Sequence, residues 1–300
     1  MSAGTITYAG IGDEAGLEPR AQIGALARLG WTAIELRTVH GSTIADLDER
    51  RFTEFTGALR ASGLRVVCVA SRIGSWARPI TGTFDLDLHE LEVLARRCAA
   101  LGTRQVRIMS CPNDGLSERE WQRRSIDRIR ILVRRAEQAG LVLLHENCSG
   151  WAGTSAERML RLIDEVDSPA LRLLFDTGNG VAHGYHAYDL LTDIAPHVAH
   201  VHVKDADGDC AEPVYVLPGA GRARVADCLR LLLRRGYCGV WSIEPHLDLR
   251  PHEQQSCRAG AAGSFVAAGV ALADLVRDQV LPAVPGWAPV PGGAIRRPDR

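Results

Sequence analysis

Acidic and imidazole side chains stand at the ends of four short apolar segments in the second half of the chain. These segments place polar groups at Glu146, Asp176, His202 and Glu244. A carboxylate among apolar residues is costly to bury unless it is paired or binds a metal. Three carboxylates and one imidazole suit a six-coordinate divalent ion, so we expect one cation at this site. Mn²⁺ is the first choice, with Mg²⁺, Co²⁺ and Zn²⁺ as alternatives.

The four segments belong to a longer alternation of β-branched runs with amphipathic helical patterns, which recurs eight times. The expected strands are Ile6–Ile11, Ala33–Val39, Arg65–Ser71, Arg104–Ser110, Leu141–Asn147, Leu171–Thr177, Ala199–Asp205 and Gly239–Pro245. The helical patterns between them include Asp46–Ala61, Leu88–Leu101, Glu118–Ala139 and Arg224–Arg235. The strands begin about 28–40 residues apart, which is the length of a βα unit. Eight such units favour a single-domain α/β fold, a (β/α)8 TIM barrel over residues 1–280.

The end of the chain has a different composition. From Leu281 onward it holds five prolines and three glycines. We expect no regular element in residues 281–300, and we interpret them as a tail or an arm at an interface.

The overall composition excludes several function classes. The 300 residues are 46% apolar and 24% charged, with a formal net charge of −1, which excludes a disordered chain and a strongly basic nucleic-acid binder. No run of about 18 apolar residues predicts a membrane span, and the first residues lack the pattern of a secretory signal. The eight cysteines are scattered without a C-x-x-C pair, as in reduced thiols. We therefore expect a cytoplasmic protein with no nucleic-acid or membrane partner.

Further polar residues lie near the same strand ends. Side chains alternate along a strand, so Glu35 shares a face with Arg37, and His202 shares one with His200 and Lys204. The residues expected to contact a substrate are Glu35, Arg37, Asn179, Lys204, His246 and Trp151. His200 and His145 are expected to support the metal ligands.

Plainer interpretations of these residues stay open. Glu35 and Arg37 could form an ion pair at the rim, and Trp151 could pack against the barrel or a partner subunit. His200 could be a hydrogen-bonded interior residue, and His145 a structural residue that faces the helices. After the sixth strand, a segment with two histidines and two tyrosines, His183 to Tyr188, is either a lid over the substrate or plain surface.

Gly10-x-Gly12-x-x-Ala15 follows a strand and imitates a dinucleotide-binding fingerprint. Asp13 and Glu14 would lie where a pyrophosphate binds and would repel it. That interpretation also leaves the four strand-end ligands unexplained, so we do not expect a nicotinamide or flavin cofactor.

Several motifs resemble those of the xylose isomerase-like barrel superfamily. They are Glu146-Asn147, Asp176-Thr177-Gly178-Asn179, His200-Val201-His202-Val203-Lys204-Asp205, Pro218-Gly219-x-Gly221 and Ile243-Glu244-Pro245-His246. The sugar phosphate isomerase/epimerase branch is the most similar, with ketose 3-epimerases, hydroxypyruvate isomerase and inosose dehydratase as relatives. Gly12-Asp13-Glu14 and Glu35-Leu36-Arg37 resemble one subgroup of that branch. The resemblance extends to about Val280, and it differs at Ala220, where relatives often carry Glu.

The resemblance implies that Glu146, Asp176, His202 and Glu244 hold one divalent metal. It also implies that Glu146 and Glu244 serve as acid and base on opposite faces of the substrate. A metal that bridges a carbonyl and a neighbouring hydroxyl oxygen stabilises the enediolate formed when the adjacent proton leaves. We therefore expect a metal-dependent isomerase or epimerase of a small keto-sugar or related polyol ketone.

Three alternatives remain. One is a metal-dependent lyase similar to inosose dehydratase, in which Lys204 could protonate a leaving hydroxyl. A second is a phosphodiesterase similar to endonuclease IV, which would need more histidine and acidic ligands than this chain supplies. A third is a non-catalytic sugar-binding subunit. Barrels of this branch are often dimers or tetramers, so a homo-oligomer is expected by analogy.

Overall fold

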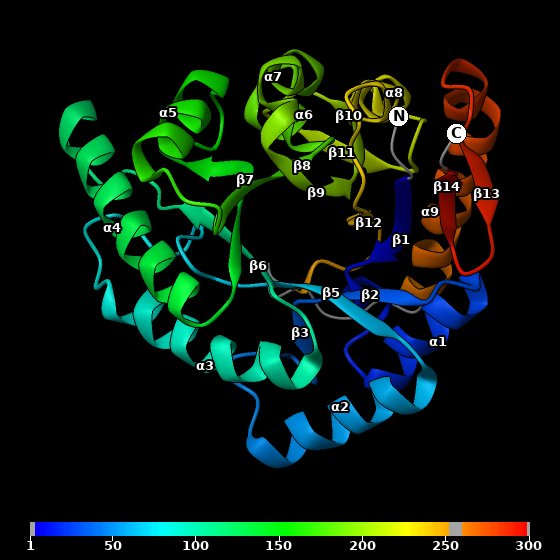
Figure 1. Ribbon diagram of the computed structural model, residues 1–300, viewed down its shortest axis with the longest axis horizontal. Helices are drawn as coiled ribbons and strands as arrows, with labels where there is room; N and C mark the ends of the chain where they lie inside the picture. Colours follow the sequence, from blue (N-terminus) through cyan, green and yellow to red (C-terminus); the bar gives the residue numbers. More distant parts are fainter. Residues whose placement is uncertain (1–3, 252–259, 299–300) are drawn as a thin grey trace.

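Eight parallel strands form the inner wall of the molecule in the computed structural model, which describes residues 4–251 and 260–298 (Figure 1). These strands are β1 (Gly4–Gly10), β2 (Ala33–Leu36), β5 (Arg65–Ala70), β6 (Gln105–Ser110), β7 (Val142–Gly150), β8 (Leu171–Asp176), β9 (Val198–Val203) and β12 (Val240–Ile243). They are hydrogen-bonded in the order β1-β12-β9-β8-β7-β6-β5-β2. A parallel bridge between Ile11 and Glu35 joins the two ends of this row. The predicted single-domain TIM barrel is confirmed, and every predicted strand overlaps an observed one.

Helices follow the strands and cover the outside of the barrel (Figure 1). They are α1 (Pro19–Leu29), α2 (Glu49–Ser62), α3 (Asp85–Leu101), α4 (Glu118–Gln138), α5 (Ala156–Val166), α6 (Asn179–His183), α7 (Ala187–Ile194), α8 (Val225–Arg234) and α9 (Ala261–Leu275). Side chains at the starts of α2, α4 and α5 accept hydrogen bonds from backbone N–H groups of the first turn. Gly63 ends α2 in the left-handed conformation, with φ of 71°.

Shorter elements complete the described chain. Single turns of 3-10 helix are η1 (Gly12–Ala15), η2 (Ala195–His197) and η5 (Leu281–Ala283), and η4 (Val276–Val280) is a π-helical turn. Two small hairpins stand outside the barrel: β3 (Thr38–Val39) with β4 (Ser42–Thr43), and β10 (Asp205–Gly208) with β11 (Pro213–Val216). The second hairpin extends directly from the end of β9, so it lies at the rim where the predicted site residues are found.

The alternation of side chains along each strand creates two separate interiors. Leu143 of β7 faces the helices and belongs to the large apolar core between the helices and the sheet. Leu144 faces the barrel axis and belongs to a small cluster of Ala9, Ala33, Val67, Cys68, Leu144, Leu174 and Val240. Glu146 is on the same face as Leu144, two residues closer to the carboxyl end. The barrel interior therefore has an apolar layer below the polar residues of the site.

The expectation that residues 281–300 contain no regular element is wrong. Two strands, β13 (Ala288–Val290) and β14 (Ala294–Arg297), form an antiparallel hairpin, and β14 pairs with β1 (Figure 1). Without β14, the edge of β1 at the barrel seam would have unpaired backbone groups.

The turn of this hairpin also crosses the seam. The carbonyl of Gly293 accepts from the Tyr8 N–H at 2.7 Å, and that of Gly292 accepts from the Thr32 N–H at 3.3 Å. A Cβ atom on Gly293 would lie 2.3 Å from Cδ1 of Trp31, so this contact requires glycine. The boundary between residues 1–280 and 281–300 stays a prediction.

No helix within the described residues is long and apolar enough to cross a membrane. The seven cysteines that lie in the described ranges are all free thiols, as the sequence predicts, and Cys257 lies outside them.

Candidate metal centre

Four side chains from neighbouring barrel strands meet at the carboxyl ends of those strands. Glu146 lies in β7, Asp176 ends β8, His202 lies in β9 and Glu244 directly follows β12. One ligand atom from each lies within 4.8 Å of the other three, and all four residues are buried. The structure brings together the residues predicted to bind a cation, and cation binding itself stays a prediction.

His202 is oriented from below by Glu35. Nε2 of His202 donates to Oε1 of Glu35 at 3.0 Å, and Nε2 of His200 donates to Oε2 at 2.8 Å. Although burial opposes it, the two imidazoles hold the pKa of Glu35 well below its usual range. Both oxygens of Glu35 are thus occupied within a fully buried residue. We therefore assign Glu35 to orienting the histidines, as metal ligands usually require, and not to substrate contact.

The other ring nitrogen of His202 faces the carboxylates. Its Nδ1 lies 3.4 Å from Oε2 of Glu244, 3.8 Å from Oε1 of Glu146 and 3.9 Å from Oδ2 of Asp176. This Nδ1 is buried and has no hydrogen-bond partner among the described residues. An orphaned nitrogen aimed at three carboxylates fits the donor set of a divalent cation.

Asp176 is held by backbone groups at the start of α6. Its Oδ1 accepts from the N–H of Gly178 at 2.7 Å and of Asn179 at 2.9 Å. Its Oδ2 lies 3.0 Å from Nζ of Lys204. Burial raises the pKa of Asp176 to about 6, and the charge of Lys204 counteracts that rise.

Glu146 has two weaker neighbours. Nδ2 of Asn179 donates to Oε1 at 3.0 Å, and Nε of Arg107 lies 3.4 Å from Oε2. Burial alone would raise the pKa of Glu146, but the positive charge of Arg107 and the nearby imidazole of His202 lower it to about 2. Asn179 therefore contacts a predicted metal ligand directly, and its predicted substrate contact stays a prediction.

Each carboxylate oxygen of Glu244 accepts a hydrogen bond from a positively charged side chain. Nη1 of Arg37 donates to Oε1 at 2.7 Å, and Nζ of Lys204 donates to Oε2 at 2.8 Å. Burial opposes ionisation, yet Lys204 and the nearby imidazoles hold the pKa of Glu244 well below its usual range. Glu244 is therefore a rigidly positioned carboxylate.

Arg37 in turn forms ion pairs with two acidic residues of η1. Its Nε and Nη2 donate to the two oxygens of Asp13 at 3.0 and 2.8 Å, and Nη2 also donates to Oε1 of Glu14 at 3.0 Å. The backbone N–H and Nδ1 of His246 both donate to Glu14, at 2.7 Å each. Burial raises the pKa of Glu14 to about 7. Arg37 and His246 are thereby fixed on one side of the centre.

The centre contains more negative than positive side chains. Its buried carboxylates are Asp13, Glu14, Glu35, Glu146, Asp176 and Glu244. Its buried cations, apart from imidazoles, are Arg37, Arg107 and Lys204. A divalent cation at the four ligands would reduce this excess of negative charge, so the residues present fit such an ion.

Two predicted residues lie away from the open side of the centre. Trp151 is 1% exposed, belongs to the core between helices and sheet, and donates through Nε1 to Glu118 at 3.0 Å. The plainer interpretation of Trp151, a packed side chain, fits this position better than substrate contact. His145 is fully buried on the opposite face of β7 from Glu146, and neither ring nitrogen has a hydrogen-bond partner among the described residues. Burial lowers the pKa of His145 to about 4, so it packs as a neutral residue.

Sequence reasoning missed three members of the centre. Arg107 stands in β6 between the apolar residues Val106 and Ile108, and a lone charge at an inward position of a buried strand was the available signal. Asp13 and Glu14 were considered as groups that would repel a pyrophosphate and as part of a motif of one subgroup, but not as members of the centre. Two consecutive acidic residues directly after the first strand were the available signal for an ion pair with Arg37.

Asp205 explains the Pro218-Gly219-x-Gly221 motif. Its carboxylate accepts from the backbone N–H groups of Gly219, Gly221, Ala223 and Ala206 at 2.8 to 3.1 Å. A Cβ atom on Gly221 would lie 2.5 Å from Oδ1 of Asp205. This carboxylate therefore fixes the loop between β11 and α8.

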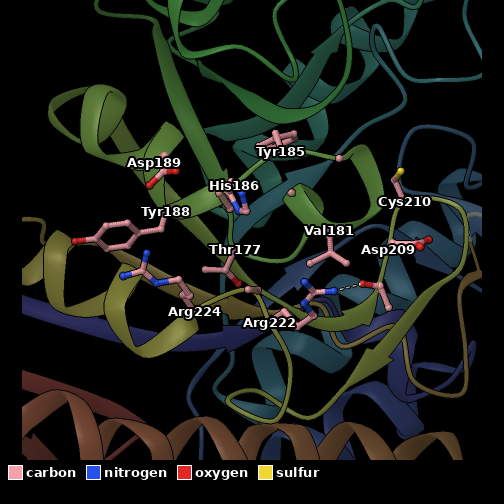
Figure 2. A pocket seen from close by; sticks show the side chains of 15 residues that line it. Thr177, Val181, Tyr185, His186, Tyr188, Asp189, Asp209, Cys210, Arg222 and Arg224 are labelled. Atoms are coloured by element: carbon pink, nitrogen blue, oxygen red, sulfur yellow. Dashed lines mark hydrogen bonds between the residues drawn. The ribbon is translucent and has the colours of Figure 1, made fainter.

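The fixed loop forms one wall of a cleft beside the centre, shown in Figure 2. The cleft has a volume of about 550 Å³, and α6, α7 and their connection form the opposite wall. Tyr188 lies under the guanidinium of Arg224, 4.0 Å from it, and Arg222 donates to the carbonyl of Gly208. The segment from His183 to Tyr188, predicted as a lid or plain surface, therefore borders a cleft. Thr177, which directly follows Asp176, also lines this cleft. The four ligands themselves do not line it.

Comparison with known proteins gives one family match. The profile of the family described as xylose isomerase-like TIM barrel matches residues 23–262. Among curated proteins, inosose dehydratase of Bacillus thuringiensis strain Al Hakam is 25% identical over an alignment of 147 positions, which covers 44% of this chain and 49% of that protein. The chain thus matches about half the length of this relative.

Solved structures are similar over nearly the whole chain. The IOLI protein with a bound zinc atom has a TM-score of 0.74 and 15% identity, covering 91% of this chain and 99% of that chain. D-allulose 3-epimerase from Methylomonas sp., in complex with D-allulose, has a TM-score of 0.70 and 17% identity, covering 93% and 99%. At these identities the likeness shows the shared fold.

Proposed function

Because the chain belongs to the xylose isomerase-like TIM barrel family, we propose that it is a metal-dependent isomerase or epimerase of a small keto-sugar or related polyol ketone. The observation that carries this proposal is the placement of two ionised glutamates, Glu146 and Glu244, among four converging ligands. Glu146, Asp176, His202 and Glu244 would hold the divalent cation, with Mn²⁺ as first choice. The cation would polarise a ketone oxygen of the substrate and stabilise negative charge that develops there.

The two glutamates carry the proton transfers. The pKa of Glu146 is lowered to about 2 and that of Glu244 is held well below its usual range, so each is present as a carboxylate that can accept a proton. One glutamate removes the proton next to the ketone. In an epimerisation the other glutamate first takes up a proton from solvent and supplies it to the opposite face, and the first then releases its proton to solvent; in an isomerisation the first glutamate passes its own proton to the adjacent carbon. Nζ of Lys204, beside Glu244 and Asp176, donates to oxygen atoms that gain negative charge.

The test combines removal of metal with solvent exchange. Chelated protein is expected to lose turnover of a keto-sugar panel, and Mn²⁺ is expected to restore it. In D₂O, the loaded protein is expected to incorporate deuterium at the carbon next to the ketone. Turnover that survives exhaustive chelation would contradict the proposal. As a matched control, Glu92→Gln changes an exposed carboxylate on α3 and should leave both results unchanged.

A dehydratase is the second candidate, and one observation favours it. Lys204 places an ammonium group 2.8 Å from Glu244 and 3.0 Å from Asp176, where it could protonate a leaving hydroxyl. The curated relative reported above is named inosose dehydratase. Mass spectrometry separates the candidates, because a dehydratase product is lighter by one water. Lys204→Met should then abolish water loss while proton exchange next to the ketone continues.

Secondary proposals accompany the main one. We propose that the site binds a carbohydrate-like small molecule and that the protein is cytoplasmic. We also propose that its active form is a homo-oligomer, a dimer or tetramer. Sedimentation analysis of the metal-loaded protein measures the oligomeric state, and a monomer across the accessible concentration range would contradict this last proposal.

A further inference from the structure

Arg107 is buried beside the centre with most of its hydrogen-bonding capacity unused. Its neighbours in β6, Val106 and Ile108, belong to the core between helices and sheet, so Arg107 points into the barrel. The residue is 6% exposed, and its nearest acid is Glu146 at 3.4 Å. Its Nε is buried without a hydrogen-bond partner, and its Nη1 and Nη2 donate to no side chain or carbonyl within residues 4–251 and 260–298.

Arg37, on the other side of the same centre, behaves differently. Its guanidinium donates four hydrogen bonds to three carboxylates, so its charge is fully used by the protein. A buried guanidinium has five N–H groups and is costly to bury unless they are satisfied. The contrast between Arg37 and Arg107 therefore points to an acceptor for Arg107 that arrives with the substrate.

The position of Arg107 selects the kind of acceptor. A guanidinium presents its N–H groups in a planar fork that matches a carboxylate. Arg107 lies next to Glu146, one of the two groups proposed to transfer the proton, so its acceptor would lie close to the reacting carbon. A singly charged, planar carboxylate suits this depth better than a phosphate, because Glu146, Asp176 and Glu244 already make the site acidic.

We propose that Arg107 binds a carboxylate of the substrate, which makes the substrate a keto acid of the sugar series rather than a neutral keto-sugar. This inference rests on the proposed function, since it concerns the same site and the same reacting carbon. It leaves the roles of the four ligands unchanged. It adds a specificity-determining residue that discriminates substrates by the charge on the carbon next to the ketone.

Two probes that differ only at C1 test the proposal. D-fructose has a hydroxymethyl group there, and 2-keto-D-gluconate has a carboxylate. Calorimetric titration of the Mn²⁺-loaded protein is expected to give about ten- to hundredfold tighter binding of the acid, the size expected for charge-assisted hydrogen bonds. Arg107→Met should remove that preference, and Arg107→Lys should keep part of it. Arg96→Met, at an exposed position of α3, is the control and should keep all of it.

Each outcome decides a separate point. Equal binding of the two probes to the unaltered protein, or a preference that survives in Arg107→Met, would overturn the role of Arg107 alone. Equal weakening of both probes by Arg107→Met would mean that Arg107 only positions Glu146, and would also overturn it. Preference for D-fructose 6-phosphate over the acid would replace the carboxylate with a phosphate and overturn it. Failure of the loaded protein to bind any probe would count against the proposed function and this inference together.

Discussion

Glu244 and Glu146 belong to the same ligand set, yet their surroundings differ. On the side of β12, the two oxygens of Glu244 accept hydrogen bonds from Arg37 and Lys204. Arg37 in turn donates to Asp13 and Glu14. On the side of β7, Glu146 receives one amide hydrogen bond and one long contact from a guanidinium. We call these the β12 side and the β7 side. One carboxylate is held by two charged side chains, and the other has fewer and weaker contacts with the protein.

This difference suggests a division of labour. A network in which every member is satisfied is rigid, and removing one member leaves buried charges without partners. The β12 side therefore contributes to stability as well as to chemistry. The β7 side is expected to contribute less to stability, and under the proposal above its Arg107 binds the substrate.

The first prediction compares the same substitution on the two sides. Glu244→Gln and Glu146→Gln should each lower net interconversion of two epimers about 10³-fold, because each glutamate handles one face of the substrate. Each variant should still exchange the proton of one epimer with D₂O, and the two variants should keep opposite epimers. NMR of each epimer in D₂O measures this. Exchange with both epimers in either variant would mean that a single glutamate serves both faces.

The second prediction compares the two arginines in the metal-free protein. Arg37→Met leaves Asp13, Glu14 and Glu244 without their common cation, so the free energy of unfolding should fall by about 3–5 kcal/mol. Arg107→Met removes only one long contact, and the loss should be about 1 kcal/mol or less. Urea denaturation of both variants measures the difference. Equal losses would remove the distinction between the two sides.

Much of the fold could be predicted from the sequence because its signals are local. Each strand is a short β-branched run, and residues such as Gly63 mark where a helix ends. The C-terminal hairpin could not be predicted in the same way. Its prolines and glycines suggest an irregular chain, and only the open edge of β1 gives β14 something to pair with. That edge is a property of the closed barrel and not of the segment.

The candidate site divides along a similar line. Glu146, Asp176, His202 and Glu244 could be found because each lies near the end of a predicted strand, and strand ends meet at one rim. The partner of a side chain depends on distances across the barrel, which spacing along the chain does not give. The role of Glu35 is an example, since it became clear only when two histidines were found on its oxygens. 

The third prediction concerns Glu35, which contacts His202 from below. Glu35→Gln keeps the shape of Glu35 but weakens its hydrogen bond with Nε2 of His202. Residues that hydrogen-bond to a metal ligand in this way typically contribute about 10–100-fold to metal affinity. We therefore expect Mn²⁺ to bind about 10–100-fold more weakly, as measured by competition with a fluorescent chelator. Glu92→Gln is the exposed control. Unchanged affinity in Glu35→Gln would mean that His202 is oriented by packing alone, or that it does not bind the ion.

The fourth effect, which is the smallest at pH 8, concerns His145 behind the β7 side. His145 is buried with both ring nitrogens unpartnered, so His145→Leu should raise the free energy of unfolding by about 1 kcal/mol at pH 8. Burial lowers the pKa of His145 to about 4, below its value in the unfolded chain, so its contribution is complete above about pH 6.5 and is lost as the pH falls from there toward 4. The advantage of the leucine variant should therefore grow by about 2 kcal/mol at pH 5. Urea denaturation of the metal-free proteins at both pH values measures it. A leucine variant that is less stable at pH 8 would indicate that a buried water satisfies the imidazole, and the β7 side would then be more tightly held than its side-chain contacts suggest.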